Sequence, residues 1–285
     1  MTAEIMLVGA AAAVYVAAAV IAVRQLVRGE PANEYRLLAL VSLAAVCLGA
    51  VLTARGLRTG RIPAFGVFEV LVWYGLAVTL AYLALAFRHR TRGIPGILLP
   101  AVAAVVLASL PALRAPVVPV DSQILSFWLG LHVVTAFLGY GLFTLESVLA
   151  VAYLIQDRNL KRKHFGALFQ RLPSLETLDH LMYEQIGLAF LLFSFSMALG
   201  VVLVRRCGWG ITWATDPKVA GAAATWLVYA ILFHLRLGAD RHGRRMALVA
   251  LIGLACVIIT FIGVHLVAPS VHDFFLPGQG LRSGP

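Results

Sequence analysis

The chain has 285 residues and a net charge of +10, and 61% of its residues are hydrophobic while 13% are charged. Its mean hydropathy of +0.91 excludes a soluble globular domain. A helix needs about 20 mostly apolar residues to span a bilayer. Such runs lie at 5–23, 37–54, 66–87, 94–112, 124–155, 186–204, 219–236 and 247–268. We therefore predict an all-α integral membrane protein, with one domain over residues 1–285 formed by about eight transmembrane helices.

Three of these runs have special features. The first begins near Glu4 without a basic segment or a small-residue cleavage site, so we expect a retained helix rather than a signal peptide. The 94–112 run contains Pro95 and Pro100, which leaves a kinked or re-entrant segment as the alternative. The 124–155 run is longer than the bilayer requires, so we expect it to be tilted or to project into water.

The basic residues are divided unevenly between the two sets of connections. Of the 23 Lys and Arg residues, 15 lie in the connections that follow the first, third, fifth and seventh runs, and eight lie on the other side. This pattern indicates topology rather than nucleic-acid binding, and the positive-inside rule places both termini outside. The connection at 156–185 is then cytoplasmic, and the tryptophan-containing loop at 205–218 is outside.

The 156–185 connection is amphipathic. Apolar residues at helical spacing lie beside basic ones, which favours a helix on the cytoplasmic membrane surface. These apolar residues are Phe165, Leu168, Phe169 and Leu172. Anchoring is the expected role, and docking of a partner is the alternative.

The three cysteines exclude some chemistry. Cys47, Cys207 and Cys256 are far apart, and the chain contains neither CxxC nor CxxCH. We therefore expect no covalent c-type haem on this chain. The same spacing argues against a thiol oxidoreductase, which needs paired thiols for exchange.

Three histidines, His132, His234 and His265, fall within the apolar runs. Ionisable residues are costly inside a membrane, so each either bonds a backbone carbonyl or serves as a ligand, and neutral imidazole is a haem-iron ligand. His132 lies about eight residues inside the outer end of its run, which is about 12 Å in a helix. With His265 and the tail residue His272 it can belong to one outer site, whereas His234 lies near the inner end.

The segment Trp209-Gly-Ile-Thr-Trp213-Ala-Thr-Asp216-Pro217-Lys218 connects two runs on the outer side. Tryptophans at this depth are typical membrane anchors. The segment nevertheless resembles the tryptophan-rich haem-handling signature, roughly WGxxWxWDPK, of the cytochrome c assembly membrane family, which includes CcsA, CcmC and HemX-like proteins. It departs from that signature at Thr215, where the family has a third tryptophan, and at Val219, where an acid often follows the lysine.

Other segments resemble the same family in the same order. They are Leu131–Tyr140 with His132, Leu175–Tyr183, Trp226–Arg236 with His234, and the 261–266 segment with His265, followed by His272; upstream, Phe68-Glu69 resembles an acidic helix start. The resemblance implies non-covalent haem b, with one or two haems per chain. It implies that His132 and His272 ligate an outward-facing haem, with His265 as the alternative to His272.

The resemblance also implies the surroundings of the haems. The tryptophan loop with Trp209, Trp213 and Asp216 would hold the macrocycle, and Trp128 is a further candidate contact. Arg205 and Arg206 are candidates for pairing with the propionates, or equally with lipid phosphate. His234 would ligate a haem within the membrane, and His89 is a candidate second ligand there unless it is a solvated member of a basic loop.

These features together predict a protein of the bacterial cytoplasmic membrane that holds, exports or presents haem for cytochrome c assembly. A cytochrome c synthase subunit and apocytochrome c are the expected partners. No self-contained catalytic constellation is apparent in the sequence, so any enzymatic role would be as a subunit of a haem lyase. Two alternatives stay open: a HemX-like regulator acting through glutamyl-tRNA reductase, and a di-haem transmembrane electron carrier.

Overall fold

A computed structural model describes residues 2–28, 33–114, 127–207, 212–237 and 243–260, and every element within these ranges is helical. The elements are α1 (Thr2–Arg28), α2 (Glu34–Thr59), α3 (Val67–Ala86), α4 (Ile94–Ala112), α5 (Phe127–Lys161), α6 (Ala167–Arg171), α7 (Leu175–Cys207), the short 3-10 helix η1 (Thr212–Thr215), α8 (Pro217–Leu237) and α9 (Arg244–Ile258). Seven of the described helices are long and apolar enough to cross a membrane. The prediction of an all-α multi-pass membrane protein is confirmed.

The expected spans and the observed helices agree closely. The run with two prolines forms one continuous helix, α4, with Pro95 in its first turn and Pro100 in its interior. The eighth predicted span corresponds to α9, which has 15 residues; the part of that run after residue 260 lies outside the described residues. The location of both termini outside the membrane stays a prediction.

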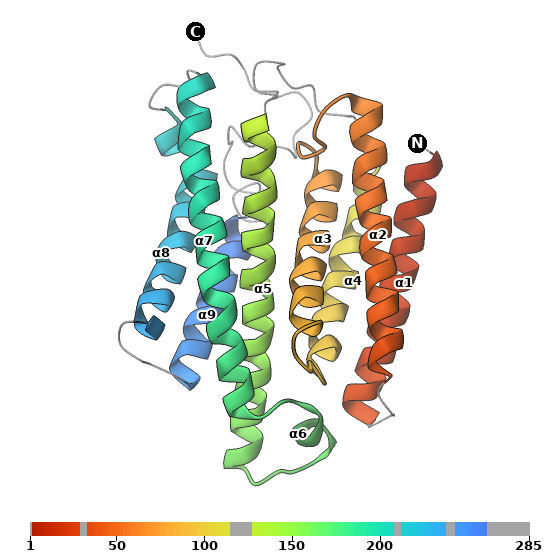
Figure 1. Cartoon of the computed structure of the whole chain (residues 1–285), viewed down its shortest axis with the longest axis vertical. Helices are drawn as coiled ribbons and strands as arrows, with labels where there is room; N and C mark the ends of the chain where they lie inside the picture. Colours follow the sequence, from red (N-terminus) through yellow and green to blue (C-terminus); the bar gives the residue numbers. More distant parts are fainter. Residues whose placement is uncertain (1, 29–32, 115–126, 208–211, 238–242, 261–285) are drawn as a thin grey trace.

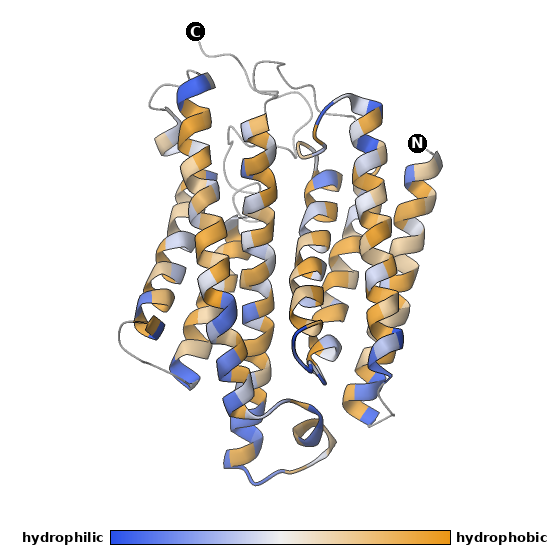
Figure 2. Ribbon diagram, viewed as in Figure 1, coloured by the Kyte–Doolittle hydropathy of each residue, from blue (hydrophilic) through white to orange (hydrophobic). Residues whose placement is uncertain are grey.

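Helix α5 lies at the centre of the bundle. It packs against α3 and α4 on one side and against α7 and α9 on the other, so it connects the α1–α4 half with the α7–α9 half (Figure 1). Apolar residues cover most of the helix surfaces and polar residues collect towards the ends (Figure 2). We call the end with η1 outer and the end with α6 inner, following the predicted topology.

Both α5 and α7 are longer than a span requires. The 35 residues of α5 correspond to about 52 Å, well beyond the roughly 30 Å of bilayer hydrocarbon. In Figure 1 the lower ends of α5 and α7 extend past the neighbouring helices and are joined through α6. The 156–185 connection therefore consists largely of helix, and only residues 162–174 link the two long helices.

Gln156 fixes this linking segment to the bundle. Its side-chain amide is buried and donates hydrogen bonds to the carbonyl oxygens of Phe169 (3.0 Å) and Pro173 (3.2 Å). Leu172 inserts into the core while Phe165 stays exposed. The segment is thus anchored to the bundle near Leu172, while the apolar side chain of Phe165 points outward.

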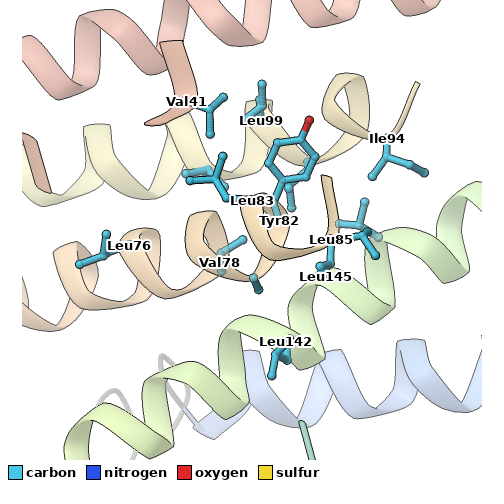
Figure 3. Close-up of a cluster of buried hydrophobic side chains, with 14 of the residues drawn as sticks. Val41, Leu76, Val78, Tyr82, Leu83, Leu85, Ile94, Leu99, Leu142 and Leu145 are labelled. Carbon is cyan, nitrogen blue, oxygen red and sulfur yellow. The ribbon is translucent and has the colours of Figure 1, made fainter. Parts of the chain in front are cut away.

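The core between α3, α4 and α5 consists mainly of aliphatic side chains. Val41 of α2 and the aromatic ring of Tyr82 in α3 pack with them (Figure 3). The two central helices cross closely at Gly141 of α5. A Cβ added there would lie 2.6 Å from the backbone carbon of Ala77 in α3. Only glycine allows this separation of the helices.

Gly141→Ala is therefore expected to lower the stability of the protein by about 1–3 kcal/mol, because α3 and α5 must move apart at the centre of the bundle. Thermal unfolding of the purified protein in detergent measures the change. Gly9→Ala in α1 is the matched control, since an added Cβ there meets nothing within 4 Å. Equal melting temperatures for the two variants would contradict the close crossing.

Candidate functional site

His132 of α5 is fixed by the backbone of α7. Its Nδ1 lies 2.8 Å from the carbonyl oxygen of Ser196 and 3.1 Å from the Ser196 hydroxyl, and that hydroxyl donates to the His132 carbonyl at 3.0 Å. Because a carbonyl oxygen only accepts, this geometry assigns the proton to Nδ1. The lone pair is then on Nε2, which is the arrangement of a histidine ligand oriented by a backbone carbonyl.

A small residue on α7 makes room for the imidazole. A Cβ added to Gly200 would lie 3.3 Å from Cε1 of His132. Ser196 and Gly200 are four residues apart and therefore share one face of α7, as small residues do where membrane helices approach closely. The sequence analysis missed both residues, although their spacing on an apolar helix was a usable signal.

One turn of α5 nearer the outer end, the Trp128 ring of α5 contacts the guanidinium group of Arg206 in α7. Trp128 precedes His132 by four residues, so both lie on one face of α5. The guanidinium carbon of Arg206 lies 5.5 Å from the centre of the Trp128 ring. Both side chains are exposed. We call His132, Ser196, Gly200, Trp128 and Arg206 the α5–α7 seam.

The tryptophan segment is organised by a helix cap. Asp216 is buried, and its Oδ1 accepts from the backbone N–H groups of Lys218 (2.8 Å) and Val219 (3.2 Å), which fixes the first turn of α8. Pro217 occupies the first helical position. Trp213 is half-buried in η1, whereas Trp209 lies outside the described residues. Asp216 is thus the N-terminal cap of α8.

The limits of the 205–218 loop are narrower than expected. Arg205 and Arg206 belong to the last turn of α7, and Lys218 belongs to α8. Arg205 is exposed. The segment between α7 and α8 is therefore 208–216, which begins three residues later and ends two residues earlier than the expected 205–218.

The two inner candidates, His89 and His234, have different surroundings in the structure. His89, just after α3, has its Nε2 2.9 Å from Oε2 of Glu184 in α7, and His180 approaches the other oxygen of the same carboxylate at 3.1 Å. His234 is exposed on α8, next to Phe233, whose ring stacks on Phe190. The outer candidates His265 and His272 lie outside the described residues.

A buried ionic cluster closes the outer ends of α1, α2 and α3. Arg55 is 3% exposed; its Nε donates to Glu69 at 2.7 Å and its Nη1 to Glu4 at 3.3 Å. Arg58 reaches the other oxygen of Glu4 at 2.7 Å. Nearby, burial lowers the pKa of the Arg61 guanidinium, and the charge of Glu69 opposes that change. These arginines hold helix ends together.

The described helices define a multi-pass membrane protein with an oriented imidazole near one end of α5. Residues 31–272 match the model of the family described as Cytochrome C assembly protein, and the chain belongs to that family. The resemblance inferred from the tryptophan segment and the histidine order is confirmed.

Similar proteins span nearly the same length as this chain. The cytochrome c biogenesis protein CcsA of Microcystis aeruginosa is 28% identical over 281 residues, which covers 82% of this chain and 85% of that protein. CcsA of Synechococcus sp. strain CC9902 is 31% identical over 259 residues, with the same coverage. CcsA of Guillardia theta is 28% identical over 250 residues, covering 81% of this chain and 83% of that protein.

Proposed function

We propose that this protein handles haem b during cytochrome c assembly and holds it at the outer end of the α5–α7 seam. The observation that carries the proposal is the orientation of His132, whose Nδ1 bonds the Ser196 carbonyl, so that Nε2 would be the atom that ligates the iron. Membership of the cytochrome c assembly family and the names of the relatives support this role. These comparisons give no support to glutamyl-tRNA reductase as a partner.

The surroundings of His132 suit a haem. The macrocycle is a flat apolar group with two carboxylates, and the seam offers an indole ring at Trp128 and a guanidinium at Arg206 beside it. His272, or His265 in its place, would supply the second ligand to the iron. Bound haem contributes an iron that accepts two imidazoles, and the chain orients one of them. Presentation to apocytochrome c through a synthase subunit is the step we assign to this arrangement.

A second haem position is favoured by the exposure of His234. This side chain lies on the outside of α8, while the preceding Phe233 packs against α7. An imidazole that faces away from its own bundle is suited to a metal shared with another chain. We propose that a synthase subunit supplies the other ligand, so that the isolated chain carries the outer haem alone.

The purified protein is expected to contain non-covalent haem b with a six-coordinate, low-spin spectrum, because two imidazoles on one iron give that state. Acid-acetone should extract the colour, since the chain has no CxxCH. A pyridine haemochrome assay gives the number of haems, and His234→Ala should leave that number unchanged for the isolated chain. A protein that stays colourless when haem is abundant would overturn the haem proposal.

The outward direction of the site is tested by cysteine labelling. Ala214 in η1 and Phe165 near α6 are both exposed. With the three native cysteines replaced by serine, Ala214→Cys should react with a membrane-impermeant maleimide in intact spheroplasts, and Phe165→Cys only after lysis. The reverse pattern would place the seam on the cytoplasmic side.

A further inference from the structure

A cavity of about 370 Å³ lies at the inner ends of α1, α2, α3 and α4, next to α6. It is far along the bundle from the α5–α7 seam, and the proposed function does not use it. Its polar and charged lining residues are Gln25, Glu34, Tyr82, His89, Thr91, Arg92, Gln170 and Arg171. Aliphatic side chains of α1 and α2, among them Leu26 and Leu37, form the rest of the wall. The cavity is therefore polar on one part, where two arginines and a histidine lie with a single carboxylate, and apolar on another.

Two neutral donors are buried in this wall. Tyr82 is 2% exposed and Thr91 is 7% exposed, and both residues line the cavity. Figure 3 shows the Tyr82 oxygen directed away from the ribbon of α3. Hydroxyl groups at this depth are suited to an oxygen-rich ligand, which they can reach without breaking the helix packing.

Two arginines supply positive charge at the same cavity. Arg92 pairs with Glu34 at 3.1 Å, but the two side chains are 63% and 41% exposed. An exposed pair of this kind contributes little free energy, so the Arg92 guanidinium can exchange Glu34 for a stronger anion. A phosphate suits two guanidinium groups because each forms charge-assisted, often bidentate, hydrogen bonds with it.

The backbone places Arg171 at this cavity. Gly93 has φ +79, and a Cβ there would lie 2.8 Å from the carbonyl oxygen of Arg171. Gln156 holds the following residues through its bonds to the carbonyl oxygens of Leu172 and Pro173. The end of α6 is therefore fitted against the α3–α4 connection, and Arg171 is among the residues that line the cavity.

We propose that this cavity binds the phosphate headgroup of an anionic phospholipid from the leaflet at the α6 end of the bundle. Basic pockets between transmembrane helices on the cytoplasmic side suit such headgroups, and the volume lies within the range of small-molecule sites. The phosphate would contact Arg92 and Arg171, and the glycerol and first acyl carbons would lie against the aliphatic wall. The proposal does not depend on haem binding.

The test is native mass spectrometry of the delipidated, detergent-purified chain with phosphatidylglycerol, phosphatidylcholine or inorganic phosphate. Wild type is expected to retain phosphatidylglycerol in preference to phosphatidylcholine. Arg92→Gln with Arg171→Gln should weaken that binding by about tenfold or more, the effect of losing charge-assisted bonds. The control is Arg88→Gln with Arg90→Gln, which removes equal charge from exposed residues of the same connection and should bind as wild type does.

A further variant avoids the risk that loss of two arginines disturbs folding. Glu34→Gln removes the carboxylate that competes for Arg92, and it should tighten phosphatidylglycerol binding about two- to fivefold. Equal weakening by the two double variants would overturn the proposal, as would equal binding of phosphatidylcholine. Displacement of the lipid by millimolar inorganic phosphate would identify free phosphate as the ligand and overturn the assignment to a lipid.

Discussion

His132→Ala is expected to convert the bound haem from a low-spin to a high-spin spectrum and to lower the amount retained through purification. The substitution removes the imidazole whose Nδ1 is held by the Ser196 carbonyl, so one coordination position of the iron opens. Absorbance spectra of the reduced and oxidised protein report the spin state, and the pyridine haemochrome assay reports retention.

Two controls separate ligation from packing. His180→Ala removes an exposed histidine at the inner end and should leave the spectrum unchanged. Ser196→Ala removes a hydroxyl but keeps the carbonyl that orients the ring, so most of the low-spin signal should remain. A wild-type spectrum for His132→Ala would show that the iron is ligated elsewhere.

Arg55→Ala is expected to destabilise the protein by about 3–5 kcal/mol, because it leaves the buried carboxylate of Glu69 without its guanidinium partner and leaves Glu4 with Arg58 alone. Thermal or denaturant unfolding in detergent measures the loss. Arg58→Ala is the matched control: its side chain is 39% exposed, so its removal should cost about 1 kcal/mol or less.

A double variant tests the origin of that loss. Arg55→Met combined with Glu69→Leu replaces the closest buried pair by apolar groups, and it should recover much of the stability lost in Arg55→Ala. If Arg55→Ala were as stable as Arg58→Ala, the buried carboxylates would not need Arg55 for their stability. The ion pairs of Arg55 would then contribute little to the free energy of unfolding.

The spans could be predicted because hydrocarbon thickness sets a length that apolar runs must meet. The order of helices and the outer position of His132 followed from the same runs and the charge pattern. The partners of His132 could not be predicted, since they depend on how α5 crosses α7. A sequence shows that Ser196 and Gly200 share a face, but it does not show which helix that face contacts.

Arg236 shows the same limit at the inner end. The charge pattern counted it with the basic residues of a cytoplasmic connection, yet its side chain is 1% exposed and its Nη1 pairs with Asp179 of α7 at 3.2 Å. Its position at the end of an apolar run suits either environment. The residue's burial depends on the packing of α8 against α7, which no local pattern specifies.

Helix α5 carries both the candidate haem ligand His132 and the Gln156 amide that secures α6. These residues are 24 positions apart on one uninterrupted helix, which corresponds to about 36 Å. An unbroken helix of this length moves as one rigid body, so a tilt or axial shift at one end also displaces the other end. A displacement of α5 at the His132 end would therefore be transmitted to the Gln156 end, where α6 is held, because both residues belong to one continuous helix.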